Sequence, residues 1–395
     1  MVTAASFVEQ VGEAAEGRVR WRMGAAARGL VLVTACLLAF GLAVLYSASA
    51  IVAQQMGYGG AYFFLKQITG VVVGIVLFAV AAKVDAGQWE RWAWPLMVLS
   101  LVLMTVVVLP WTTGIAPRVH GSRRWLLATS FQPSELAKLA VIAWTAMMTL
   151  KRRDKLRRFS KGPLPVLAVV ALLAALAAKE PDYSSAMLYV LIMAIILYVG
   201  GARIGHFILL AAVAVPLMVV GIEKSAYASQ RVRAWWTPDS VSKDVRHQVD
   251  QSLIAVGSGG VIGKGLGNGR QQLGFLPFGY NDFIGSIVGE EWGFVGMAAL
   301  ILAYAAFALL GFRIARNART PFLRLVATGL TSTVVITAYL HLAVVLDFLP
   351  ATGLTLPFIS YGRTNLVLSL LMTGVLVNIG STREEVFGDG HRVSP

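Results

Sequence analysis

The chain has 395 residues, of which 57% are hydrophobic and only 14% are charged, and its formal net charge is +14. Soluble domains use roughly 45–50% apolar residues, so this composition excludes an ordinary soluble protein and indicates an integral membrane protein. The positive charge lies in short segments between apolar runs and not in a separate basic domain, which argues against nucleic acid as a partner.

Ten apolar segments are candidates for crossing a bilayer, for which about 20 residues suffice. We therefore expect an all-α, multi-pass membrane protein with about ten transmembrane helices. The even number places both termini on the same side of the membrane. The expected spans are 27–50, 61–83, 91–111, 133–150, 163–179, 182–201, 204–222, 283–312, 322–346 and 354–380.

The chain divides into two short ends and one transmembrane domain. Residues 1–26 are expected to form a cytoplasmic segment, residues 27–383 the ten-helix domain, and residues 384–395 a cytoplasmic tail. The loop 151–161 reads KRRDKLRRFSK, and four arginines fall between residues 313 and 324. Short basic loops stay on the cytoplasmic side, so both segments are predicted to face inward.

Arg28 and Lys66 bracket the first long uncharged stretch of the chain. The fourth span, in contrast, must begin near Pro133 and carry two charges, Glu135 and Lys138, because only 12 uncharged residues follow Lys138. Their three-residue spacing puts both on one helix face, either as a mutually neutralising pair or as a functional pair. Just upstream, Arg123 and Arg124 precede Trp125 and are either an interfacial anchor or an anion clamp.

Further carboxylates and histidines stand next to or within later spans. In KEPDYSSA, residues 179–186, Pro181 favours a helix start and Asp182 is then a first-turn carboxylate. Structural and functional roles for Asp182 are both open. His341 has no cysteine or carboxylate at metal-ligand spacing, so we expect it to be packed or interfacial.

Residues 223–285 form the longest break between apolar runs, a large extracytoplasmic loop between the seventh and eighth helices that is long enough for a small folded cap. Its basic residues include Arg231, Lys264 and Arg270. A basic surface at the outer boundary suits an anionic ligand such as a lipid phosphate or pyrophosphate. Contact with ordinary anionic head groups is the alternative.

The glycine-rich stretch 257–270, GSGGVIGKGLGNGR, lies in this loop and resembles a phosphate cradle. It departs from the P-loop pattern, because Ser258 stands where the first glycine is needed and Gly265 where serine or threonine is needed. We therefore expect a flexible loop here.

Three carboxylates stand where the eighth apolar run begins, in GYNDFIGSIVGEEWGF. Asp282 is either a helix N-cap or a general base or cation ligand for a lipid-linked phosphate substrate. Glu290 and Glu291 fall about two turns into the same helix, roughly 12 Å deeper, too far from Asp282 to form the carboxylate pair of a hydrolase. Intramembrane charges are either paired or functional, so one glutamate is expected either to pair with a Lys or Arg or to act on substrate.

Together these segments resemble the SEDS family of bacterial shape, elongation, division and sporulation proteins. The match runs in the family's order over about residues 27–380. It is closer to the division or sporulation branch, which is FtsW-like, than to the RodA-like elongation branch. The matching pieces are GSRRW, SFQPSELAKLA, EPDYSSA, QSLIAVGSGGVIGKGLGNGRQQLGFLP, NDFIGSIVGEEWGFVG and LPATGLTLPFISYG.

The resemblance implies a ten-helix peptidoglycan glycosyltransferase of the bacterial inner membrane that works with a class B penicillin-binding protein. Such an enzyme polymerises lipid II on the outer face and releases undecaprenyl pyrophosphate. The family's essential aspartate falls on Asp282, the expected base of an inverting transfer or the ligand of Mg²⁺ or Mn²⁺. The expected substrate-binding residues are Arg123, Arg124, Glu135, Lys138, Asp182, Arg231, Lys264, Arg270, Glu290 and Glu291.

Some residues depart from the family's pattern. Tyr280 stands where a histidine is usual, EPDYSSA where QPDxGTA is usual, and SYGRTN, with Arg363, where SYGGSS is usual. Two other functions are compatible with intramembrane charges around a polar cavity: a lipid II flippase and a non-catalytic scaffold of a division complex.

Overall fold

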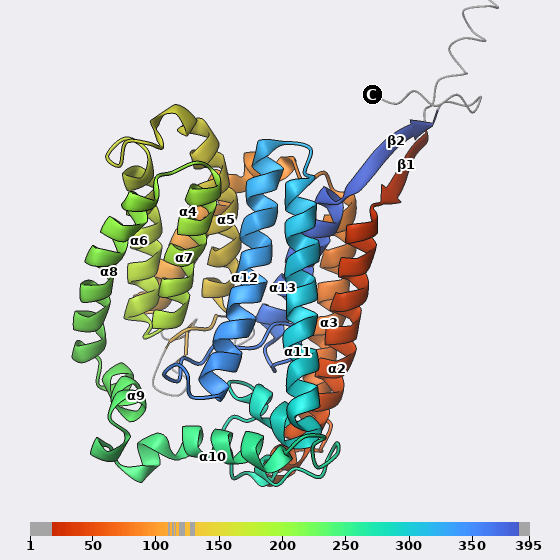
Figure 1. Ribbon diagram of the computed structural model, residues 1–395, viewed down its shortest axis with the longest axis vertical. Coiled ribbons are helices and arrows are strands. Elements are labelled where there is room, and N and C mark those ends of the chain that lie inside the picture. The colour runs from red at the N-terminus through yellow and green to blue at the C-terminus, as the bar shows by residue number, and fades with distance from the viewer. Residues whose placement is uncertain are drawn as a thin grey trace, which may run out of the picture.

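The structure is a computed structural model, and it shows a bundle of long helices with a pair of strands projecting from one end (Figure 1). Residues 1–17 of the expected N-terminal segment and residues 387–395 of the expected tail lie outside the described residues. The described residues are 18–386 apart from 110, 113, 115, 118–122 and 127–130.

Long helices coincide with all ten expected spans, which confirms the helical membrane fold. Six of them, α2, α3, α4, α8, α11 and α12, are long and apolar enough to cross a membrane, while α6, α7 and α13 are shorter apolar helices. The number of crossings stays a prediction. The bounds are α2 (Ala25–Gln55), α3 (Tyr62–Lys83), α4 (Gln88–Val108), α5 (Pro133–Lys151), α6 (Pro163–Lys179), α7 (Tyr183–Val199), α8 (Ile204–Lys224), α11 (Ile284–Arg316), α12 (Pro321–Val345) and α13 (Arg363–Ile379).

A two-stranded sheet is an addition to this helical fold that the apolar pattern did not predict. β1 (Arg18–Met23) pairs antiparallel with β2 (Ser381–Val386). The sequence of β1, RVRWRM, alternates basic and apolar residues, which is the two-residue period of a strand. Next to the sheet, the Gly24 N–H donates to the Gly380 carbonyl oxygen over 3.1 Å. The start of α2 therefore lies beside the end of α13.

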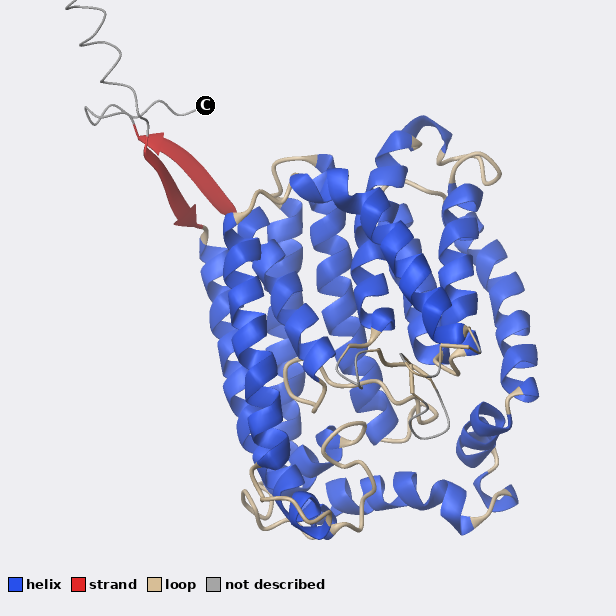
Figure 2. Ribbon diagram, turned by 180° about the vertical axis from the view of Figure 1, so that it is seen from behind, coloured by secondary structure: helices blue, strands red, loops and turns tan. Residues whose placement is uncertain are grey.

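The two ends of the bundle differ in character. The end with the strands also carries the loops between α5 and α6 and between α11 and α12, the segments expected to face the cytoplasm (Figure 1). The opposite end is covered by α9 (Ala226–Trp236) and α10 (Lys243–Gly259), which lie across it when the molecule is seen from either side (Figure 2). Residues 223–285 therefore form a largely helical cap, with short 3₁₀ turns at Pro238–Ser240 and Gln271–Leu273.

Close contacts between helices fix the bundle and the cap. A Cβ atom at Gly374 of α13 would lie 2.5 Å from the Phe78 carbonyl oxygen of α3, so only glycine lets these backbones approach so closely. On the cap, Ser252 Oγ of α10 donates to the Val345 carbonyl oxygen at 2.8 Å and lies 2.7 Å from Ser286 Oγ. The cap thus contacts the end of α12 and the start of α11, beside Asp282.

Candidate active site

Asp282 lies in a short connection between the cap and α11. The carbonyl oxygen of Tyr280 accepts a hydrogen bond from the Tyr361 N–H at 3.1 Å, and that of Asn281 accepts one from Ser360 Oγ at 2.8 Å. The backbone on the N-terminal side of Asp282 is therefore fixed by the segment between α12 and α13.

The interpretation of Asp282 as the N-cap of α11 is wrong. The helix begins at Ile284 and its N-cap residue is Phe283, which makes no side-chain capping bond. The chain completes one more turn before the helix starts, because the Asp282 N–H donates to the Phe278 carbonyl oxygen at 3.2 Å. Asp282 itself is half-buried.

Asp282 and Arg231 converge on the backbone of Gly353. From the position that a Cβ atom would take at Gly353, Asp282 Oδ2 is 3.5 Å away and Arg231 Nη1 is 3.8 Å away. Arg231, on α9, also donates from Nη1 to the Ala351 carbonyl oxygen at 3.3 Å. Because glycine has no side chain, both the carboxylate and the guanidinium can lie close to the Gly353 backbone, and both residues are half-buried.

His341 joins three parts of this site through its two ring nitrogens. Nε2 accepts from the Gly285 N–H at 3.3 Å, so Nδ1 carries the proton and donates to the Leu354 carbonyl oxygen at 2.7 Å. The side chain is buried. This confirms the expectation of a packed histidine, which here fixes α12 against the start of α11 and against the loop that holds Gly353.

An aromatic cluster stands behind the connection that carries Asp282. The rings of Phe63 and Tyr280 are 4.7 Å apart, and those of Tyr280 and Tyr361 are 5.9 Å apart. Burial, and then the neighbouring Tyr361 and Asp282, raise the pKa of Tyr280. The protonated form of the Tyr280 phenol is therefore favoured.

Glu290 is buried and fully engaged by the cap. Its Oε1 accepts from Lys264 Nζ at 2.8 Å and from the Arg270 N–H at 2.9 Å, and its Oε2 accepts from the Gln271 N–H at 3.0 Å. Glu290 is therefore paired with a basic residue, Lys264, which is one of the two expected outcomes. Lys264 and Glu290 neutralise each other and anchor the glycine-rich stretch.

Glu291 lies beside Glu290, and it contacts both α2 and the cap. Glu291 Oε1 accepts from Ser47 Oγ of α2 and from the Gly267 N–H at 3.0 Å. The helix is broken just after them, at Gly293, whose φ of 62° and ψ of −156° are outside the helical region. α11 is unbroken from Ile284 through Glu290 and Glu291, so their expected depth of roughly 12 Å below Asp282 stays a prediction.

The glycine-rich stretch is attached to α11 and not free, in contrast to the expected flexible loop. The N–H groups of Phe294 and Val295, just past the break, donate to the carbonyl oxygens of Gly260 and Val261 at 2.9 and 3.0 Å. These bonds satisfy backbone groups that the broken helix leaves without an intrahelical partner. The glycine-rich stretch therefore supplies hydrogen-bond acceptors to α11 at its break.

A second polar group lies at the start of α5. Lys138 Nζ and Glu135 Oε1 form an ion pair at 2.6 Å, and Asn365 Nδ2 of α13 donates to Glu135 Oε2 at 3.1 Å. Both charged residues are buried, with 2% of Lys138 and 7% of Glu135 exposed. The pair corresponds to the mutually neutralising arrangement, one of the two expected outcomes.

The turn between α6 and α7 is held by Arg124. Its Nε donates to the Glu180 carbonyl oxygen at 3.0 Å and its Nη2 to the Pro181 carbonyl oxygen at 2.7 Å. Asp182 is the N-cap of α7 and not a residue of its first turn as expected, and it accepts from the Ser185 N–H at 3.1 Å. Arg123 donates to the Leu109 carbonyl oxygen at 3.0 Å. In the described structure, these contacts are with the protein's own backbone.

Glu180 is a buried carboxyl group that no sequence pattern singled out. It is 2% exposed, and neither carboxyl oxygen has a hydrogen-bond partner among the described residues. Burial, then the neighbouring Asp182, raises the pKa of Glu180 from 4.5 to about 9, although Arg124 acts in the opposite direction. The only signal for it in the sequence was its position beside Asp182, where the family pattern has glutamine.

Replacing Glu180 by glutamine is expected to stabilise the protein above neutral pH. In the unfolded chain this carboxyl ionises near pH 4.5, whereas in the folded protein it keeps its proton to about pH 9. The folded state therefore binds more protons between these values, and stability falls as pH rises, by at most about 1.4 kcal/mol per pH unit. An uncharged glutamine at this position removes the dependence.

Thermal unfolding in detergent between pH 5 and pH 8 tests this expectation. The midpoint of the Glu180→Gln variant should exceed that of the parent by an amount that increases with pH. Glu223→Gln, which changes an exposed carboxylate at the end of α8, should follow the parent at every pH. A constant offset between Glu180→Gln and the parent would contradict the buried, protonated carboxyl.

The structure therefore sorts the expected site residues into neighbouring groups. Asp282 and Arg231 meet at Gly353. Asp182 lies near this pair, because Ser184 Oγ, two residues further on, donates to the Thr352 carbonyl oxygen at 3.0 Å, whereas Glu135 and Lys138 meet Asn365 of α13. The remaining group attaches the cap to α11 and consists of Lys264, Glu290, Glu291 and the backbone of Arg270.

A cation site made by the protein alone does not fit Asp282. Within the described ranges, no group of three or more His, Cys, Asp or Glu side chains could hold a metal ion. Mg²⁺ is commonly bound through one or two carboxylates together with phosphate oxygens of a substrate. Asp282 could serve as such a single protein ligand, with the neighbouring Arg231 already supplying positive charge.

Fold and site together define a multi-pass helical membrane protein with a polar, carboxylate-bearing site at the capped end of its bundle. The model of one family, described as cell cycle protein, matches residues 28–385. The chain belongs to this family, that of FtsW, RodA and SpoVE, as its sequence motifs predicted.

Several relatives match about nine tenths of the chain. The probable peptidoglycan glycosyltransferase FtsW of Trichlorobacter lovleyi is 37% identical, over 89% of this chain and 92% of its own length. The stage V sporulation protein E of Bacillus subtilis is 34% identical, over 89% of this chain and 95% of its own.

Solved structures share the fold at lower sequence identity. A chain from a peptidoglycan synthase complex, described as coordinating polymerization and crosslinking, is 24% identical and has a TM-score of 0.73, with 89% of this chain and 96% of that chain covered. The rod shape determining protein RodA of Thermus thermophilus is 24% identical, with a TM-score of 0.64 and coverage of 89% and 95%.

Proposed function

We propose that this chain is a peptidoglycan glycosyltransferase that polymerises lipid II at the outer face of the bacterial cytoplasmic membrane. The names of its FtsW relatives support this activity. The observation that carries the proposal is the convergence of Asp282 and Arg231 on Gly353, where a base and a cation lie close to the same glycine backbone.

The proposed reaction is an inverting transfer with a single base. A hydroxyl group of the acceptor sugar attacks the anomeric carbon of the donor, and its proton passes to the Asp282 carboxylate. The bond from the anomeric carbon to the pyrophosphate breaks on the opposite face, and undecaprenyl pyrophosphate leaves with the bonding electrons. Arg231 stabilises the negative charge that develops on the leaving group.

In the alternative role, Asp282 would be the protein ligand of a divalent cation, Mg²⁺ or Mn²⁺, instead of the base. Such a cation would neutralise negative charge on the pyrophosphate.

The distribution of basic loops supports an outer location for the capped end. The loop 151–161 and the arginines around residue 316 lie at the strand-bearing end (Figure 1), and basic loops are retained in the cytoplasm. The site at Gly353 lies at the other end, under α9 and α10. The proposed location is thus the bacterial inner membrane, with the active site facing outward.

A class B penicillin-binding protein is the proposed partner. The structure of a peptidoglycan synthase complex with the same fold supports this pairing, since that complex is described as coordinating polymerization with crosslinking. The partner would crosslink the glycan strands that this chain makes.

Reconstitution with lipid II tests the function. The purified protein with its cognate penicillin-binding protein should convert labelled lipid II into glycan strands, and the partner alone should not. Translocation of lipid II across vesicles without any polymer would favour a flippase. Neither polymer nor translocation, with partner binding retained, would favour a scaffold.

A further inference from the structure

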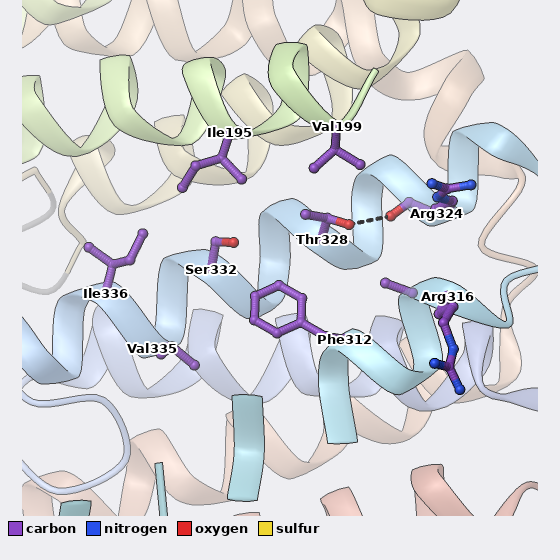
Figure 3. Close-up of a pocket in the computed structure, with 10 residues that line it drawn as sticks. Ile195, Val199, Phe312, Arg316, Arg324, Thr328, Ser332, Val335 and Ile336 are labelled. Atoms are coloured by element: carbon purple, nitrogen blue, oxygen red, sulfur yellow. Dashed lines mark hydrogen bonds between the residues drawn. The ribbon is translucent and has the colours of Figure 1, made fainter. Parts of the chain in front are cut away.

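A groove on the far side of the bundle from Asp282 has no role in the proposed reaction. It has a volume of about 550 Å³ and lies between α7, α11 and α12 (Figure 3), and its size is within the range of about 300–1,000 Å³ seen for small-molecule sites. Most of its lining is apolar, for example Ile195, Phe312 and Ile336.

The groove has one charged end and one apolar end. Arg316 and Arg324 lie at the same end of the groove, one on α11 and one on α12, while Ile195 and Ile336 lie toward the other end (Figure 3). Both arginines are exposed, and neither has an acidic partner within the described part of the chain. Arg319, three residues beyond Arg316, does have one, because it pairs with Asp85 at 3.6 Å.

The position of the arginines matches the boundary of a bilayer. Arg316 is the last residue of α11, and Arg324 lies in the first turn of α12. Along α12, Arg324 and Ile336 are separated by about 18 Å at 1.5 Å per residue. One leaflet contributes about half of the roughly 30 Å hydrocarbon core, so the groove has the length of one leaflet.

We propose that this groove binds one anionic phospholipid. Its phosphate lies at Arg316 and Arg324, whose guanidinium groups suit phosphate oxygens, and one acyl chain extends past Phe312 toward Ile195 and Ile336. The lipid would contact both α11 and α12. At the other end of the bundle, the same two helices are joined by the hydrogen bond from the Gly285 N–H to His341. Binding of the lipid should therefore stabilise the whole protein.

The test measures thermal unfolding and native mass spectra of the full chain with added lipids. Phosphatidylglycerol should bind and raise the unfolding midpoint more than phosphatidylcholine with the same acyl chains, and inorganic phosphate should have no such effect. The double variant Arg316→Gln, Arg324→Gln should keep the midpoint of the lipid-free protein and lose roughly tenfold to 30-fold in affinity for phosphatidylglycerol.

Two further variants separate the groove from charge in general. Arg313→Gln removes an exposed arginine of α11 at the same end that does not line the groove, and it should retain the preference for phosphatidylglycerol. Ile336→Trp fills the apolar end and should weaken binding while both arginines remain. Equal stabilisation by both lipids, an unchanged preference in the double arginine variant, or the same effect from inorganic phosphate would overturn the proposal.

Discussion

The Asp282→Asn variant is expected to polymerise lipid II about 10²- to 10⁴-fold more slowly than the parent, the range that a positioned general base contributes. Asparagine has nearly the same size and can keep the geometry around Gly353, but its amide cannot take a proton from the acceptor hydroxyl. The loss should appear in the rate and not in folding, because the hydrogen bonds fixing this connection come from the backbone of Tyr280 and Asn281.

Asp250→Asn is the matched control for this variant. Asp250 is also a carboxylate of the capped end, and it pairs with Arg246 at 2.7 Å on α10. Its removal should leave the rate within about twofold of the parent. The initial rate of glycan formation, with the unfolding midpoint of each variant, is the measurement. An Asp282→Asn protein that polymerises as fast as Asp250→Asn would remove Asp282 from the mechanism.

The Lys138→Met variant is expected to lose about 3–5 kcal/mol of stability, as commonly happens when one partner of a buried ion pair is removed. Lys138 is 2% exposed and lies 2.6 Å from Glu135. Its loss leaves a buried carboxylate whose remaining side-chain hydrogen bond, within the described structure, comes from the neutral Asn365 amide. Such a carboxylate must either stay charged without compensation or take up a proton, and both cost free energy.

A double variant identifies the cause of that loss. Glu135→Leu combined with Lys138→Met removes both charges, so most of the lost stability should return. The unfolding midpoint and the yield of folded protein measure this recovery. If the double variant were as unstable as Lys138→Met alone, packing and not the unpaired charge would explain the effect. Polymerisation by the recovered double variant then tests whether the pair also binds substrate.

The sequence located the helices well because a bilayer acts as a simple solvent. Each spanning helix must be apolar over its length and satisfy its own backbone hydrogen bonds, so long apolar runs predict it without knowledge of its neighbours. The fourth span illustrates this, since counting uncharged residues after Lys138 led to Pro133, the first residue of α5. The pair at three-residue spacing likewise followed from helix geometry alone.

Predictions that assumed regular continuation were less successful. The eighth expected span is not one regular helix, because α11 is broken at Gly293, where φ is positive. The glycine-rich stretch resembled a flexible loop because glycine disfavours regular structure, yet it pairs with the backbone beyond that break. Neither property is local, since each depends on contacts between α11 and residues more than 20 positions upstream.

By itself, the sequence determined a multi-pass helical membrane protein, the approximate ends of its helices, its family, and the identity of the candidate base, Asp282. Only the tertiary structure decided which charges meet. It brought Arg231 of α9 and Asp282 to Gly353 and paired Lys264 with Glu290. It also placed Arg316 and Arg324 at one end of the groove between α7, α11 and α12. The physical reason is that hydrophobicity is a property of each segment, whereas an electrostatic partner is set by distance between segments far apart in the chain.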